Sequence, residues 1–145
     1  MFTDIEGSTR LLGALGGDSY GRLLQDHYEL IVSSAERNGG RLVATEGDGC
    51  FIVFPTATQA VAAALTAQRD LAEHPWPPGV AVKVRMGLHT GSPVSMDENY
   101  VGMDVHRAAR IADAAHGGQV IASSPTMQLT DELGVDWVSL GQYRL

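Results

Sequence analysis

FTDIEGSTR, residues 2–10, places two carboxylates and a small-residue turn directly after a short apolar stretch. If the segment starts as a strand, Asp4 and Glu6 share a face, and Asp4 lies near the end of that strand. Ser8 or Thr9 can then cap a following helix, whose free N–H groups form an anion site. The segment by itself has two interpretations: a strand end with an ordinary helix cap, or a cation ligand beside a cradle for an anion.

The composition limits the class of protein. The chain has 145 residues, 44% of them hydrophobic and 19% charged, which is typical of one folded domain spanning residues 1–145. A net charge of −7 argues against a nucleic-acid partner, because phosphate backbones are bound by Lys and Arg. No apolar run approaches ~18 residues, so we expect no membrane contact and a cytoplasmic location. Cys50 is the single cysteine and has no disulfide partner. Because Met1 stands so close to Asp4, the domain is expected to be trimmed at one or both ends.

Hydrophobic periodicity predicts the order of the elements. The predicted helices cover residues 19–37, 58–73 and 104–115, with a short one opening at Pro125. The predicted strands cover residues 41–45, 50–54, 80–88, 92–96, 120–122 and 135–140, after a first strand within 2–6. This order indicates an α+β fold with a mainly antiparallel, ferredoxin-like sheet flanked by helices.

A second carboxylate, Asp48, lies in the sequence Glu-Gly-Asp-Gly at residues 46–49, between two predicted strands. Asp-Gly is common at hairpin tips for steric reasons, so the residue alone indicates a turn. Asp4 and Asp48 form one site only if their strands are neighbours. The separation of the two residues along the chain does not show whether the strands are neighbours.

Four motifs together carry a resemblance to a known family. They occupy residues 2–9, 46–49, 87–91 and 100–110. Their order and spacing resemble those of class III nucleotide cyclases, and the run AHGGQV, residues 115–120, is similar to bacterial members. The resemblance covers nearly the whole chain and implies the fold of the class III cyclase homology domain.

The resemblance implies a two-metal site. Asp4 and Asp48 match the family's two metal-binding aspartates, and the backbone carbonyl of Ile5 matches an additional ligand. Two divalent cations, usually Mg²⁺ or Mn²⁺, would bind the triphosphate of ATP and lower the pKa of the ribose 3′-hydroxyl, which attacks the α-phosphorus and expels pyrophosphate.

The resemblance also implies roles for the turn and for a distant arginine. Gly7, Ser8 and Thr9 would hold the phosphates. Arg110 matches the arginine that stabilises charge developing on the α-phosphate. In the family the aspartates come from one protomer and the arginine from its neighbour, so the implied active unit is a head-to-tail homodimer with sites at the interface.

Three positions depart from the family pattern, and all concern the base or the ribose. Ala44 stands where adenylate cyclases typically carry a lysine that reads adenine, and Asn99 stands where its partner is usually an aspartate. An amide can accept from adenine or donate to guanine O6, so Asn99 reads the base ambiguously. His106 replaces an asparagine that orients the ribose. On a helix it shares a face with Arg110, so it is either a catalytic group or a surface histidine.

The sequence therefore predicts an adenylate cyclase that converts ATP to 3′,5′-cyclic AMP, with low activity and poor discrimination against GTP. The alternative is a degenerate, catalytically inactive nucleotide-binding or dimerisation module that regulates an attached domain. A third, weaker alternative is an unrelated ferredoxin-like ligand-binding domain in which the motifs serve only turns and caps.

Overall fold

The computed structural model describes residues 1–97 and 99–143. Within these residues the main sheet has five strands, in the order β2 (Arg41–Glu46), β3 (Gly49–Val53), β1 (Phe2–Ile5), β4 (Val84–Leu88) and β7 (Val120–Ala122). All neighbouring pairs are antiparallel except β4 and β7, which are parallel. The fold is therefore α+β with a mainly antiparallel sheet, as predicted. The register pairs Thr3 of β1 with Cys50 of β3 on one side and with Met86 of β4 on the other.

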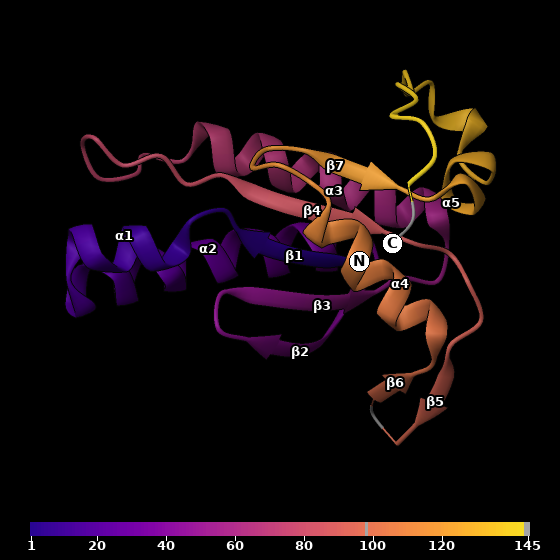
Figure 1. Ribbon diagram of the computed structural model, residues 1–145, viewed down its shortest axis with the longest axis horizontal. Coiled ribbons are helices and arrows are strands. Elements are labelled where there is room, and N and C mark those ends of the chain that lie inside the picture. The colour runs from indigo at the N-terminus through magenta and orange to yellow at the C-terminus, as the bar shows by residue number, and fades with distance from the viewer. Residues whose placement is uncertain (98, 144–145) are drawn as a thin grey trace.

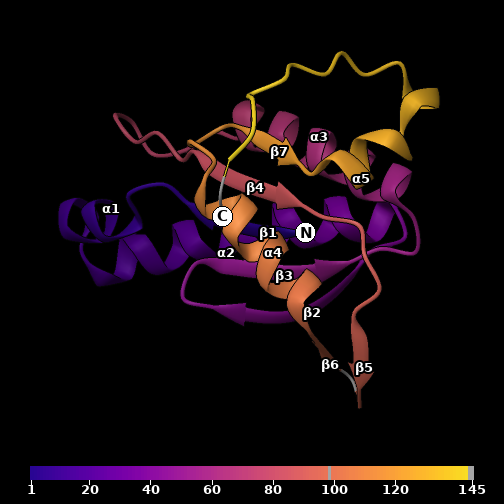
Figure 2. The ribbon, with the colours of Figure 1, turned by 45° about the vertical axis from the view of Figure 1, so that its right-hand side comes forward.

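Helices cover both faces of this sheet. They are α1 (Ser8–Leu15), α2 (Gly17–Arg37), α3 (Ala57–Glu73), α4 (Met103–Asp113) and α5 (Ser124–Gln128), followed by a 3₁₀ turn at Asp131–Leu133. Both views show α2 and α3 behind the sheet and α4 crossing in front of it (Figures 1 and 2). α4 contacts β4, β1 and β7, so it covers one half of its face of the sheet.

The core lies between the sheet and the α2–α3 layer. Alternate strand residues point into it and are fully buried, among them Ile5, Ile52, Val84 and Met86. Several intervening residues, including Asp4 of β1 and Arg85 of β4, point to the α4 face and stay partly exposed. Alternation along the strands thus separates a dry apolar layer from a half-open polar face.

Close packing of α4 on β4 depends on one glycine. A Cβ atom at Gly87 would lie 2.2 Å from the backbone nitrogen of Ala112, a separation that atoms cannot adopt. Any larger residue at this position would push α4 away from the sheet. The helix that carries His106 and Arg110 is therefore held at a fixed height above β4.

A separate two-stranded sheet projects from the domain. It pairs β5 (Val94–Met96) with β6 (Asn99–Val101), and both figures show it extending away from the main sheet below α4 (Figures 1 and 2). The guanidinium of Arg41 on β2 lies 5.7 Å from the centre of the Tyr100 ring on β6. This contact ties the projecting sheet to the edge of the main one.

Several predicted boundaries need correction. The strand predicted at 80–88 begins at Val84, because Val80 still belongs to a turn in which its N–H donates to the Pro77 carbonyl. The strand predicted at 92–96 covers only Val94–Met96, and β6 was not predicted. The helix predicted at 19–37 starts at Gly17.

The strand predicted at 135–140 is wrong. Residues 134–143 have no regular structure, although Val135 and Trp137 pack against the core. Alternation of apolar residues reports the burial of one face, and here that burial occurs without strand pairing. The predicted cap is also wrong: Ser8 is the first residue of α1, and the N-cap is Gly7, which has no side chain to donate or accept. Cys50 is buried and free, as expected. In residues 1–97 and 99–143 we find no helix that is both long enough and apolar enough to cross a membrane.

Candidate functional site

The two predicted metal aspartates lie side by side. Asp4 is on β1, and Asp48 is at the tip of the β2–β3 hairpin, beside β1 in the sheet. The Asp48 Oδ2 atom accepts a hydrogen bond of 2.7 Å from the backbone N–H of Ile5, which fixes the hairpin tip against the end of β1. Burial raises the pKa of Asp4, and so does a hydrogen bond with the Asp48 carboxyl group. The question that spacing left open is thus answered: the strands are neighbours and the carboxylates meet.

An arginine that the sequence analysis did not select completes this group. Arg85 of β4 forms an ion pair with Asp4 through its Nη2 atom. Its side chain is 26% exposed, and that of Asp4 is 33% exposed. The buried Nε–H of Arg85 has no hydrogen-bond partner among the described residues. The alternation of Lys83 and Arg85 with apolar neighbours marked this strand face as polar, but the pairing of β1 with β4 was needed to place Arg85 on Asp4.

The donor set fits a divalent cation bound together with a phosphate ligand. Two adjacent carboxylates suit a hard cation such as Mg²⁺, which usually keeps several ligands from water or from substrate phosphates. In residues 1–97 and 99–143, no cluster of three or more His, Cys, Asp or Glu side chains could hold a metal by itself. The Ile5 side chain is buried, so only its backbone is available beside the two carboxylates. Asp4 and Asp48 therefore suit a cation that arrives with its own oxygen ligands.

The turn after β1 presents backbone donors next to these carboxylates. Gly7 has φ = +71°, a left-handed conformation that favours glycine, and α1 starts directly after it. The first N–H groups of a helix have no partner within the helix, so those of Ser8 and Thr9 are available to an anion. The Ser8 hydroxyl is hydrogen-bonded to Tyr20. A Cβ at Gly7 would lie 3.8 Å from Nη2 of Arg10, which places a second cationic side chain over the turn.

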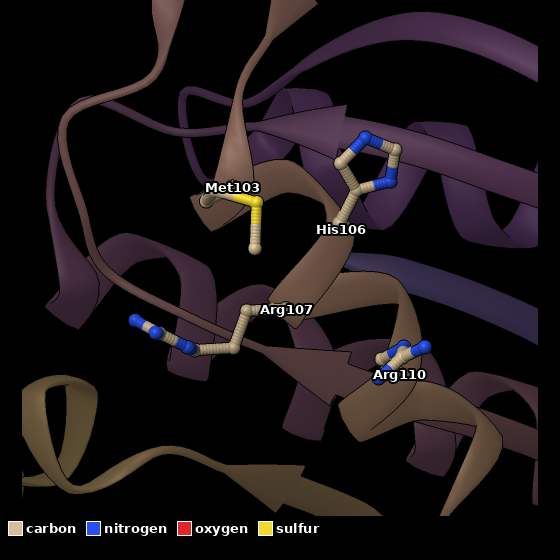
Figure 3. A pocket seen from close by; sticks show the side chains of 4 residues that line it. All are labelled: Met103, His106, Arg107 and Arg110. Atoms are coloured by element: carbon tan, nitrogen blue, oxygen red, sulfur yellow. The ribbon is translucent and has the colours of Figure 1, made fainter. Parts of the chain in front are cut away.

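His106 and Arg110 lie on a different surface, on the exposed side of α4. With Met103 and Arg107 they line a hollow of about 320 Å³ (Figure 3). Neither carboxylate lines this hollow, and no ion pair or hydrogen bond joins the Arg110 side chain to Asp4 or Asp48 among the described residues. Arg107 is exposed and reaches Asp104 at 3.4 Å. One chain therefore does not bring the predicted arginine to the predicted metal aspartates.

The two predicted base-reading residues are both accessible. Ala44 is exposed on β2, opposite Phe51 of β3. Asn99 is exposed on β6, and its Oδ1 atom accepts a hydrogen bond of 2.8 Å from the N–H of Tyr100. That bond engages Oδ1 and leaves the amide NH₂ of Asn99 available as a donor.

A buried hydrogen-bond chain fixes the start of α4. The imidazole of His89, only 3% exposed, has Nδ1 at 2.8 Å from the Ser123 hydroxyl and Nε2 at 3.2 Å from the Asp104 carboxylate. Asp104 also accepts from the N–H of Ser92 at 2.9 Å, and this bond is the main cause of a lowered pKa at Asp104. The His-Thr-Gly turn thus joins the end of β4 to the helix that carries Arg110.

Comparison with known proteins identifies the family of the chain. The sequence model of the protein family described as the adenylate and guanylate cyclase catalytic domain matches residues 1–145. The chain is 32% identical to an adenylate cyclase of Lachancea kluyveri over 86% of this chain and 8% of that protein. It is 36% identical to an uncharacterised protein of Mycobacterium tuberculosis over 100% of this chain and 50% of that protein. The chain thus spans half or less of the length of these relatives.

Solved structures agree with this comparison. An adenylate cyclase of Trypanosoma brucei, solved as a monomer, superposes with a TM-score of 0.85 at 26% identity, over 97% of this chain and 78% of that one. An adenylate/guanylate cyclase/hydrolase of Silicibacter pomeroyi gives a TM-score of 0.76 at 30% identity, over 90% of this chain and 76% of that one. The family model and the superposed folds agree, and the chain belongs to the family of adenylate and guanylate cyclase catalytic domains.

Proposed function

We propose that the domain is an adenylate cyclase that converts ATP to 3′,5′-cyclic AMP and pyrophosphate at the interface of a head-to-tail homodimer. The observation that carries the proposal is the meeting of Asp4 and Asp48 on one surface while Arg110 stands on another, with no contact between them. One chain then offers two halves of a site, and a second copy is required to join them. The fungal relatives named adenylate cyclase support ATP as the substrate.

The carboxylate half binds and orients the triphosphate. Asp4 and Asp48 would hold two divalent cations, Mg²⁺ or Mn²⁺, together with the Ile5 carbonyl. When bound, these cations supply Lewis acidity that lowers the pKa of the ribose 3′-hydroxyl. The free N–H groups of Ser8 and Thr9 and the backbone of Gly7 donate to phosphate oxygens.

The helix half stabilises the charge that develops in the reaction. A bond forms between the ribose O3′ and the α-phosphorus, the bond to the bridging oxygen breaks, pyrophosphate leaves, and the 3′-hydroxyl proton passes to solvent. The Arg110 guanidinium of the second copy would balance charge on the α-phosphate oxygens, an effect on the order of a hundredfold or more in rate. His106, one helical turn before Arg110, would orient the ribose.

Selectivity for the base is expected to be poor. The Ala44 methyl group has no polar atom with which to read a base. The exposed amide of Asn99 can accept from the amino group of adenine or donate to O6 of guanine, which occupies the equivalent position on the base. ATP and GTP are therefore expected to compete, and the incomplete base contacts are expected to lower the activity.

Mixing two inactive variants tests both the chemistry and the dimer. Asp4→Ala and Arg110→Ala should each abolish formation of cyclic AMP from ATP with Mn²⁺. When the two are mixed, a heterodimer contains one intact site, so activity should return to about a quarter of the wild-type level after random exchange. Glu46→Ala is the matched control, since Glu46 is exposed on the same hairpin as Asp48 and should leave the rate unchanged.

The same assay distinguishes this proposal from the alternative, an inactive nucleotide-binding module that regulates an attached domain. Ala44, Asn99 and His106 are the residues that motivate that alternative. Binding of ATP without turnover, in both Mg²⁺ and Mn²⁺, would support it. Activity in either single variant, or none in the mixture of two folded variants, would contradict the proposed two-half site.

A further inference from the structure

The geometry points to Arg85 as an internal cation that occupies Asp4 until a metal ion displaces it, so that Arg85 sets the concentration of metal the site requires. This inference rests on the proposed metal site at Asp4 and Asp48. It concerns a residue outside the motifs that identified the family.

The contact itself is specific. The Nη2 atom of Arg85 lies on Oδ2 of Asp4, a carboxylate that would also have to bind the cation. Arg85 lies directly opposite Asp4 in the register of β4 with β1, so the pairing of the two strands holds the guanidinium beside this carboxylate. The second carboxylate, Asp48, is held at the end of β1 by the N–H of Ile5. Without a bound metal ion, the positive charge of Arg85 therefore balances part of the negative charge of the two carboxylates.

The surroundings give Arg85 other carboxylates to approach. Besides the hydrogen bond with Asp4, the nearby charges of Asp113 and Glu6 favour its charged form. Asp113 is the last residue of α4 and is exposed, and Glu6 follows β1. The Nε–H of Arg85 has no hydrogen-bond partner in the described residues, so the guanidinium is not locked to Asp4 by its full set of donors. A divalent cation at Asp4 would repel the guanidinium, and the negative charges of Glu6 and Asp113 would attract it away from Asp4.

Direct competition has a definite thermodynamic signature. Replacing the arginine removes the competitor, so Arg85→Met should bind Mn²⁺ more tightly than the wild type. We expect the half-saturating Mn²⁺ concentration to fall about fivefold or more, measured on the nucleotide-free domain by electron paramagnetic resonance of the unbound Mn²⁺. Asp4→Asn serves as the variant that should lose this binding.

A matched control separates contact from net charge. Lys83 lies two residues before Arg85 on the same side of the chain and is exposed. Lys83→Met changes the net charge by the same amount without touching Asp4, so its half-saturating concentration should change less than about twofold. Arg85→Lys keeps the positive charge but loses the planar guanidinium. Its half-saturating Mn²⁺ concentration should therefore lie between those of the wild type and Arg85→Met. Thermal unfolding checks that each variant is folded.

A second measurement follows the arginine directly. The Nε–H signal of Arg85 in a ¹H–¹⁵N spectrum, identified by its absence in Arg85→Lys, should shift during titration with Mg²⁺. Its midpoint should match that of metal binding. If Mg²⁺ binds while the signal stays fixed, or if Arg85→Met binds Mn²⁺ no more tightly than Lys83→Met, then Arg85 does not compete.

The outcome is independent of the proposed enzymatic reaction. Formation of cyclic AMP by the wild type together with unchanged Mn²⁺ affinity in Arg85→Met would overturn this inference and leave the proposed function standing. Tighter Mn²⁺ binding in Arg85→Met, without any cyclic AMP from the wild type, would support this inference and overturn the proposed function.

Discussion

The hydroxyl group of Tyr28, on α2, donates a hydrogen bond to the backbone carbonyl of Gly47, the residue directly before Asp48. The bond joins a long helix to the tip of the β2–β3 hairpin, 19 residues away along the chain. Gly47 has φ = +58°, so the tip is held in a conformation that suits glycine. Asp48 is thus fixed from two sides, by α2 through this carbonyl and by the N–H of Ile5.

Removing this anchor should loosen Asp48 and weaken metal binding. Tyr28→Phe loses one hydrogen bond at a partly exposed position, which is expected to cost about 1 kcal/mol in the free energy of unfolding. The affinity for Mn²⁺ should fall a few-fold, measured by the same titration as for Arg85→Met. Tyr143→Phe is the control, because Tyr143 is 69% exposed. Equal affinities in the two variants would show that Tyr28 does not position Asp48.

A buried histidine should make the stability of the domain depend on pH. His27 is fully buried, neither ring nitrogen has a hydrogen-bond partner among the described residues, and burial lowers its pKa from 6.5 to about 4. Below pH 6.5 the unfolded chain takes up a proton that the folded domain does not. Stability should therefore fall as the pH drops from 6.5 to about 4, by about 3 kcal/mol in total, and this contribution should be constant above 6.5.

Urea unfolding of His27→Leu across this pH range measures that contribution. The difference in unfolding free energy between wild type and variant should change with pH between 6.5 and about 4 and stay level above. His116→Gln provides the comparison, since His116 is exposed and should follow the wild type. A difference for His27→Leu that is independent of pH would mean that His27 is protonated alike in both states.

Restoring the usual pair of base-reading residues should restore selectivity. Ala44→Lys combined with Asn99→Asp supplies a donor and an acceptor that match adenine, so the ratio of ATP to GTP turnover should rise about tenfold or more. Thr45→Lys with Asn99→Asp is the control, because Thr45 is exposed on β2 but points to the other face. An unchanged ratio in the first double variant would place base reading elsewhere.

The hydrogen-bond chain through His89 should matter to the helix that carries Arg110. His89→Ala leaves the Asp104 carboxylate and the Ser123 hydroxyl without this partner, which is expected to cost about 2 kcal/mol in the free energy of unfolding. Urea unfolding measures the loss, and the cyclase rate should fall by a larger factor than ATP affinity, since α4 would lose its fixed orientation. His116→Ala, at an exposed histidine, should change neither quantity.

Local sequence patterns predicted most elements but not the relationships between distant strands. The alternation along residues 80–88 predicted the strand that the structure has as β4, and the Glu-Gly-Asp-Gly tip predicted the hairpin. The contact of Arg85 with Asp4 joins residues 81 positions apart, and it follows from the pairing of β1 with β4, which no local pattern encodes. The strand predicted at residues 135–140 was wrong for a related reason. Val135 and Trp137 alternate and pack against the core as strand residues would, but without pairing to another strand.

The candidate site was predictable to the same extent. Asp4, Asp48 and Arg110 could be selected because their segments resemble motifs of the class III cyclase family. The residues alone left Asp4 as a possible strand end and Asp48 as a possible turn. Arg10 was not selected, since its position over Gly7 depends on where α1 begins. That start is set by a glycine rather than by the hydroxyl cap that the sequence led us to expect.

The parallel pairing of β4 with β7 has a consequence for association. The connection from β4 to β7 includes α4, and this helix lies mainly over β4, β1 and β7. Between β1 and β3 the rings of Phe2 and Phe51 stack with centres 4.4 Å apart, and both residues are half-buried. If a second copy shields these rings, unfolding of the domain and dissociation of the pair become one equilibrium, and the melting temperature should rise with protein concentration.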